Sequence, residues 1–174
     1  MEDTLTTVIA IALSAVLMFV FPLMTMSDRT DDISQLTVET ATTEFVDKIR
    51  TTGKITPDEY DKFQQNIGST GNTYNVELQV KVLDENPGKK VTQTQVDKIG
   101  ENVYYSVYTS QIEEQLNSGK TYTLKEGDLV SVSVKNTNQT LAQQLKNFFY
   151  TVIGNDTYTI AASHGGMVSA TGIN

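Results

Sequence analysis

The stretch LTTVIAIALSAVLMFVFPLMTM, residues 5–26, contains no charged side chain. A helix of this length, rising about 1.5 Å per residue, would be roughly 33 Å long and would cross the hydrocarbon core of a bilayer. Backbone polar groups find no water in lipid, so the segment is expected to be helical. We therefore predict a transmembrane anchor over residues 1–27 of a single-pass protein of the cell membrane, with lipid as one of its partners.

The residues that flank the apolar segment do not decide its orientation. Glu2 and Asp3 precede it, whereas a secretory signal peptide begins with basic residues. On the other side, Arg29 stands among three aspartates within residues 28–32, so the positive-inside rule gives no clear answer.

The helix is expected to continue beyond the anchor. Pro22 lies inside the apolar run and predicts a kink there. From Ser27 to Arg50 there is no glycine and no further proline, and Gly53 is typical of a helix C-terminus. Apolar side chains recur at spacings of three and four, which places them on one stripe of a helix. The stripe contains Ile33, Leu36, Val38, Ala41, Phe45, Val46 and Ile49. We predict an amphipathic continuation over residues 28–53.

Residues 54–174 are expected to form one globular α+β head, with a small antiparallel sheet and packed helices. Thr56 and Glu59 form a capping box around Pro57, which predicts a helix that ends at Gly68. Strict alternation of apolar and polar residues predicts a strand over 74–83.

The second half of the head is less regular. Residues 103–108 fit a strand or the end of a helix from Val96, and 129–134 fit a strand in either phase. We expect a helix over 110–117 and a turn at 86–88. A last strand over 158–162 is expected to break at Gly165-Gly166 and resume over 167–171.

An amphipathic helix is predicted over residues 137–153, capped by Asn138 or Thr140. Its apolar residues are expected to face the core: Leu141, Leu145, Phe148, Phe149 and Val152.

Composition excludes several classes of function. The formal net charge of −8 argues against binding nucleic acid and against a polybasic grip on anionic lipid. Without cysteine and with the single histidine His164, the chain cannot build a typical structural zinc site. No G-x-S-x-G elbow or other catalytic constellation is present. We expect a protein that is not an enzyme and carries neither cofactor nor metal.

The layout of the first fifty residues resembles type IV pilins and pilin-like proteins. Three features carry the resemblance: the apolar segment, Pro22, and the stripe from Ile33 to Ile49. The stretches EFVDKIRTTGKIT from Glu44 and TGNTYNVELQV from Thr70 are similar to TadE-like proteins of the Tad (tight adherence) pilus class. Prepilins carry a leader ending in glycine and often a glutamate five residues into the mature chain. Leu5 occupies that place here, so either no prepilin peptidase acts or the chain is already processed.

The resemblance implies a membrane-anchored structural subunit, major or minor, of an adhesive surface filament or a secretion pseudopilus. Its head would lie outside the cytoplasm, and its partners would be copies of itself, related subunits and the assembly machinery. Glu2 and Asp3 would pair with a neighbour's terminal amine. The implied helix assembly interface comprises Glu2, Asp3, Pro22, Ile33, Val38, Ala41, Phe45 and Ile49.

The alternative is a membrane-anchored binding or assembly-scaffold module that never polymerises. A polymerising subunit should leave Val38, Ala41, Phe45 or Ile49 partly uncovered. A binding module should bury that stripe and present a separate concave patch. An anchored enzyme, a third reading, should bring His164 beside acids in a pocket.

Overall fold

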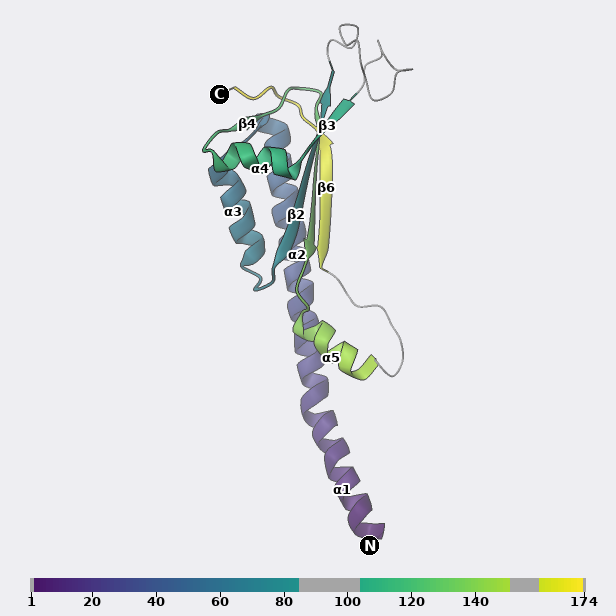
Figure 1. Cartoon of the computed structure of the whole chain (residues 1–174). Helices are drawn as coiled ribbons and strands as arrows, with labels where there is room; N and C mark the ends of the chain where they lie inside the picture. The colour runs from purple at the N-terminus through teal and green to yellow at the C-terminus, as the bar shows by residue number, and fades with distance from the viewer. Residues whose placement is uncertain (1, 85–103, 151–159, 174) are drawn as a thin grey trace.

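The computed structural model describes residues 2–84, 104–150 and 160–173, which form a long helical rod joined to an α+β head (Figure 1). The elements in chain order are α1 (Glu2–Ala15), the π-helical turn η1 (Val16–Val20), α2 (Phe21–Thr52), β1 (Lys54–Ile55), α3 (Pro57–Gly68), β2 (Tyr74–Leu83), β3 (Tyr104–Tyr108), α4 (Thr109–Asn117), β4 (Tyr122–Thr123), β5 (Leu129–Asn136), α5 (Leu141–Tyr150) and β6 (Ala161–Met167).

The rod is an uninterrupted helical run from α1 to the end of α2, as the sequence predicted. It ends at Thr52, and Gly53 follows in the left-handed conformation with φ of +65° and donates its N–H to the Ile49 carbonyl at 2.8 Å. A Cβ at Gly53 would also overlap the backbone at Ala170 and Gly172. Glycine is therefore required here for its conformation and for the close passage of the C-terminal segment.

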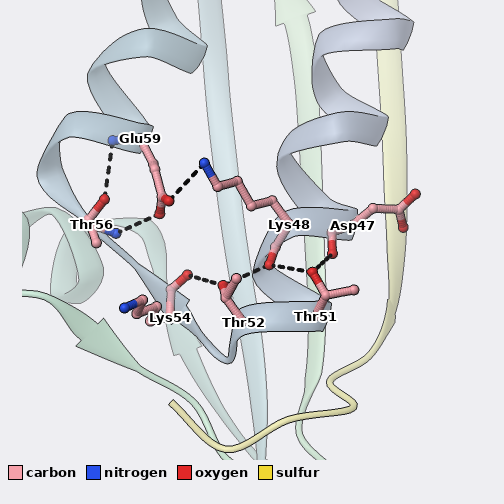
Figure 2. A network of polar contacts seen from close by, with 7 residues as sticks. All are labelled: Asp47, Lys48, Thr51, Thr52, Lys54, Thr56 and Glu59. Carbon is pink, nitrogen blue, oxygen red and sulfur yellow. Dashed lines mark hydrogen bonds and ion pairs between the residues drawn. The ribbon is translucent and has the colours of Figure 1, made fainter. Parts of the chain in front are cut away.

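A short polar turn reverses the chain between α2 and α3 (Figure 2). The predicted capping box is present: Thr56 Oγ1 accepts from the Glu59 N–H at 3.3 Å, and Glu59 Oε2 accepts from the Thr56 N–H at 3.4 Å. The other carboxylate oxygen of Glu59 pairs with Lys48 Nζ at 2.9 Å. Since Lys48 belongs to α2, the same glutamate caps α3 and holds it against α2.

The main sheet is antiparallel with the strand order β3-β2-β5-β6. Its inner face carries a layer of cross-strand apolar pairs, among them Leu78–Val132 and Val80–Val130. The sequence left the phase of β5 open, and the structure points Val130, Val132 and Val134 inward. The predicted strand over 74–83 is confirmed, and residues 104–108 are a strand.

The core lies between this sheet and α2, with α3 and α4 on the same side of the sheet (Figure 1). Phe45 of α2 stacks on Phe63 of α3 with ring centroids 4.4 Å apart. The Tyr60 hydroxyl donates to Glu113 Oε1 at 2.7 Å and ties α3 to α4. The prediction of an antiparallel sheet with helices packed on one face is thus confirmed.

The expected break at Gly165-Gly166 is wrong, because β6 pairs with β5 without interruption from Ala161 to Met167. A Cβ at Gly165 would press on the Val130 carbonyl, and one at Gly166 would meet the Arg50 guanidinium. The glycine pair therefore permits close packing by a neighbouring strand and by α2, and it does not bend the strand.

The expected inward face of α5 is also wrong at its first residue. Thr140 caps the helix, since its Oγ1 accepts from the Gln143 N–H at 3.2 Å. Leu141 is 53% exposed, whereas Ala142 and Gln143 are buried. The predictions for the side chains of Phe148 and Phe149, for Val152, for the turn at 86–88 and for a helix from Val96 fall outside the described residues.

The close passage of the C-terminal segment at Gly53 leads to a prediction about stability. Gly53→Ala should lower the free energy of unfolding by more than the roughly 1–2 kcal/mol of a left-handed alanine, because the added Cβ also overlaps the C-terminal backbone. Gly71→Ala is the matched control, since Gly71 has φ of +79° and nothing within 4 Å of its Cβ position. Both are measured by denaturant unfolding of the full chain in detergent micelles. Equal losses in the two variants would contradict the packing argument.

Candidate functional site

The apolar segment of the rod projects from the head without any cover from the described residues. Its large side chains are exposed apart from the half-buried Val20 and Met24, and Phe19 is 70% exposed. The exposed set comprises Leu5, Val8, Ile9, Ile11, Leu13, Val16, Leu17, Met18, Phe19, Phe21, Leu23 and Met26. The helix is long and apolar enough to cross a membrane. A continuous apolar surface of this size is typical of a surface that lipid or another protein covers.

Three of the polar side chains within the segment bond to the backbone of the helix itself. Thr7 Oγ1 donates to the Asp3 carbonyl at 2.7 Å, Ser14 Oγ to the Ala10 carbonyl at 2.8 Å, and Thr25 Oγ1 to the Phe21 carbonyl at 3.1 Å. These hydroxyls need no water, so they are compatible with an apolar environment.

A π-helical turn precedes the proline of the segment. Pro22 has no N–H to donate, and its ring conflicts with the carbonyl four residues earlier, at Met18. Met18 lies within η1, where the bonding pattern widens from the α-helical one. The helix thus accommodates Pro22 by a local change of pitch, while the kink itself stays a prediction.

The predicted stripe on the outer half of the helix divides between two surfaces. Val38, Ala41, Phe45 and Ile49 are buried in the head, so the described structure does not leave them uncovered for a neighbour. Ile33 is 66% exposed, on a different face of α2. The polymerisation criterion stated from the sequence is therefore not met by these four core residues.

The buried face of α2 continues toward the N-terminus through polar residues. Ser27, Asp31 and Ser34 are all buried, at the same spacing of three and four that leads on to Val38. The sequence argument extended the stripe through Ile33 and Leu36 because they are apolar, and both of these are exposed. The reason why these buried residues are polar lies in the segment that packs against them.

That packing segment is the start of α5. Thr140 Oγ1 donates to Asp31 Oδ2 at 2.6 Å, and Lys146 Nζ pairs with Asp28 Oδ1 at 2.6 Å. Sequence reasoning missed this junction, because nothing in the local pattern links α5 to residues more than one hundred positions earlier. The only sign of this junction in the sequence is that four of the five residues 28–32 are charged.

Burial sets the electrostatics of this junction. Desolvation raises the pKa of the Asp31 carboxyl, and the hydrogen bond from Thr140 offsets part of that effect. The charged form of Asp31 is thus disfavoured in the folded protein relative to the unfolded chain.

The remaining predicted residues lie apart from this junction. Glu2 and Asp3 form the first turn of α1, and Asp3 is exposed, which suits an acid beside a helix N-terminus. Their pairing with a neighbour's amine stays a prediction. His164 Nε2 lies 3.5 Å from Asp47 Oδ1, but that oxygen already accepts from Arg50 Nη1 at 2.8 Å. Asp47 is therefore engaged mainly by the guanidinium.

A shallow depression between α2 and α3 is the concave surface nearest to the buried stripe. Lys48 and Glu59 lie at one end, and Ala41, Glu44 and Asn66 continue it along the helices. Its ion pair is largely solvated on the lysine side, where the side chain is 56% exposed. The depression is a surface groove without a convergent set of catalytic groups among the residues described.

The Asp31 contact generates a pH prediction. Asp31→Asn keeps an acceptor for the Thr140 hydroxyl but cannot ionise. Because the pKa of Asp31 is raised in the folded state, protonation favours folding, and that stability is lost as the pH rises through the raised pKa. The stability of Asp31→Asn relative to the unsubstituted protein should therefore increase from about pH 4 to neutral pH. Denaturant unfolding in micelles measures it.

Asp31→Ala is the contrasting variant at the same position. It leaves the Thr140 hydroxyl without its acceptor in a buried site and should be about 1–3 kcal/mol less stable than Asp31→Asn at every pH, since neither variant ionises at this position. A difference between Asp31→Asn and the unsubstituted protein that does not change with pH would contradict the electrostatic argument.

Comparison with known proteins adds no family to these observations. No protein-family model matches the chain, and no curated protein or solved structure matches it. The resemblance to pilin-like proteins thus rests on the residues quoted from the sequence, and the function must be argued from the geometry.

Proposed function

We propose that this protein is a membrane-anchored, pilin-like structural subunit of a surface filament or secretion pseudopilus. Its N-terminal helix crosses the membrane once, its head lies outside the cytoplasm, and it assembles with copies of itself or related subunits. The observation that carries the proposal is the uncovered apolar helix between Leu5 and Met26, which continues without a break into the helix on which the head is built.

The apolar helix needs a water-free environment in every state of the protein. Before assembly, lipid would cover it, as its length of roughly 33 Å allows. After assembly, the helices of neighbouring subunits would replace lipid. Ala10 and Ser14, one turn apart, allow the backbones of two such helices to approach closely. Repeated contacts of this kind that do not close on themselves build a fibre.

The exposed face of α2 above the apolar segment extends the same argument. Ile33 and Leu36 lie one turn apart and are 66% and 64% exposed. They lie on α2 beyond the end of the apolar segment, after Asp31 and Asp32. We infer that in a filament they contact a neighbouring subunit.

The non-polymerising anchored module remains the second candidate, and one observation favours it. Val38, Ala41, Phe45 and Ile49 are buried, as that alternative required, although the shallow depression between α2 and α3 is lined partly by Ala41 and Phe45 and is not separate from the stripe. In that case the apolar helix would serve as an anchor alone.

Shearing of cells that express a tagged copy separates the two candidates. A filament subunit should be recovered in sheared, pelletable filaments, whereas a stationary module should stay in the membrane fraction. The filament assignment is wrong if the tagged protein inserts in the membrane and folds but never appears in the sheared fraction under conditions in which the cells make filaments.

A pair of matched variants tests the interface. Ile33→Asp places a charge on the proposed subunit contact and should reduce filament recovery at least about tenfold, since burying an unpaired charge is expensive. Ile173→Asp makes the same change at a residue that is 82% exposed at the other end of the chain, and it should leave recovery unchanged. Similar recovery of both variants would show that Ile33 contacts no neighbour.

A further inference from the structure

Helix α5 packs on the rod with its polar side and turns its apolar side outward. Ala142 and Gln143 are buried, and Lys146 of α5 pairs with Asp28 of α2. Leu141 and Leu145 lie on another face, one turn apart, where Leu141 is 53% exposed and Leu145 half-buried. A helix of a soluble domain is normally oriented the other way, with its apolar face inward.

The position of α5 along the rod accounts for this orientation. Its two polar contacts are with Asp28 and Asp31, which lie two and five residues beyond Met26, or roughly 3 and 8 Å along the helix axis. The capped start of α5 is at Asp31 and Lys146 is at Asp28, so the helix runs toward the apolar segment. Figure 1 shows α5 leaving the rod below the sheet and slanting toward the N-terminal end.

We propose that α5 is an interfacial helix that lies at the surface of the bilayer crossed by the rod, with its Leu141–Leu145 face at the boundary between headgroups and acyl chains. This inference rests on the proposed membrane crossing. The occupant of the exposed face is lipid, because α5 runs from Asp31 toward the apolar segment, and its contact at Asp28 lies two residues from the end of that segment, which the same bilayer covers. An amphipathic helix at this depth is a recognised mode of membrane contact.

The charges around the junction indicate which lipid feature is recognised. Lys146 is paired with Asp28, Asp31 is buried, and Asp32 is exposed. No excess of basic side chains is present near α5 among the described residues, so attraction to anionic headgroups is not the source of binding. The contact is apolar and should form on zwitterionic phosphatidylcholine.

The consequence is a head held at a fixed height and rotation on the membrane. The rod alone would leave the head free to tilt and rotate about its axis. A second contact to one side of the rod removes that freedom, and it presents a defined side of α2 to neighbouring subunits.

The chain contains no tryptophan, which permits single-tryptophan reporters. Four variants of the full chain are reconstituted in phosphatidylcholine vesicles: Leu141→Trp, Phe19→Trp, Ile33→Trp and Met167→Trp. Fluorescence quenching is compared between lipids that carry a nitroxide near the headgroup and lipids that carry it deep in the acyl chain. All four positions are exposed, so a tryptophan fits at each.

The four reporters separate the inference from the proposed function. Phe19→Trp should be quenched most by the deep label, which reports the membrane crossing itself. Leu141→Trp should be quenched more by the shallow label than by the deep one. Its fluorescence in vesicles should also peak at a shorter wavelength than the fluorescence of the unfolded chain without detergent. Ile33 is two residues from Asp31, about 200° around α2 and away from α5, so Ile33→Trp controls for height. Met167, beside Arg50 and roughly 36 Å beyond Met26, should not be quenched.

Each failure has its own meaning. Absence of deep quenching at Phe19 would overturn the membrane crossing and the inference together. Quenching at Phe19 with none at Leu141, or equal quenching at Leu141 and Ile33, would overturn the inference alone. The same holds if Leu141→Trp is shielded only at protein concentrations at which the subunits associate, because the occupant would then be a second copy.

Discussion

The packing of one face of α2 against the sheet is the constraint on which the rest of the molecule depends. The same helix is apolar all round below Met26 and buried on one side above Ser27, so the head has to assemble around a rod that it does not enclose. Three parts of the head meet α2: the sheet on the side of Val38 and Val46, α3 through the Phe45–Phe63 stack, and α5 through Asp31, while α4 is tied to α3. The uncovered remainder of the rod is long and apolar enough to cross a membrane.

Local chemistry made much of the fold predictable. The left-handed Gly53, the Thr56–Glu59 capping box and the alternation along β2 each depend on interactions within a few residues, and all three are present. The Gly165-Gly166 pair was misread because its role depends on Arg50 and Val130, which are distant in sequence. A glycine that bends a strand and one that makes room for a helix look the same in a sequence.

The candidate site also has a part that local sequence predicts and a part that depends on distant contacts. The apolar segment was predictable from composition alone, since nothing has to cover it for the pattern to be visible. The polar buried face of Ser27, Asp31 and Ser34 was not, because a rule that places apolar residues inside favours Ile33 and Leu36. The orientation of α5 was missed for the same reason: Leu141 faces outward where a purely soluble domain would bury it.

The attachment of β6 to α2 has a mechanical consequence. Gln35 bonds both backbone groups of Ala161, at 2.7 and 3.0 Å, and Arg50 Nε bonds the Met167 carbonyl at 3.1 Å. Fifteen helical residues span roughly 22 Å and six strand steps roughly 20 Å, so helix and strand run alongside each other with matched lengths. Tension applied along the rod would load these attachments and the β5–β6 ladder in shear, all at once, and would not peel them one by one. A head built in this way resists being pulled off its own stalk.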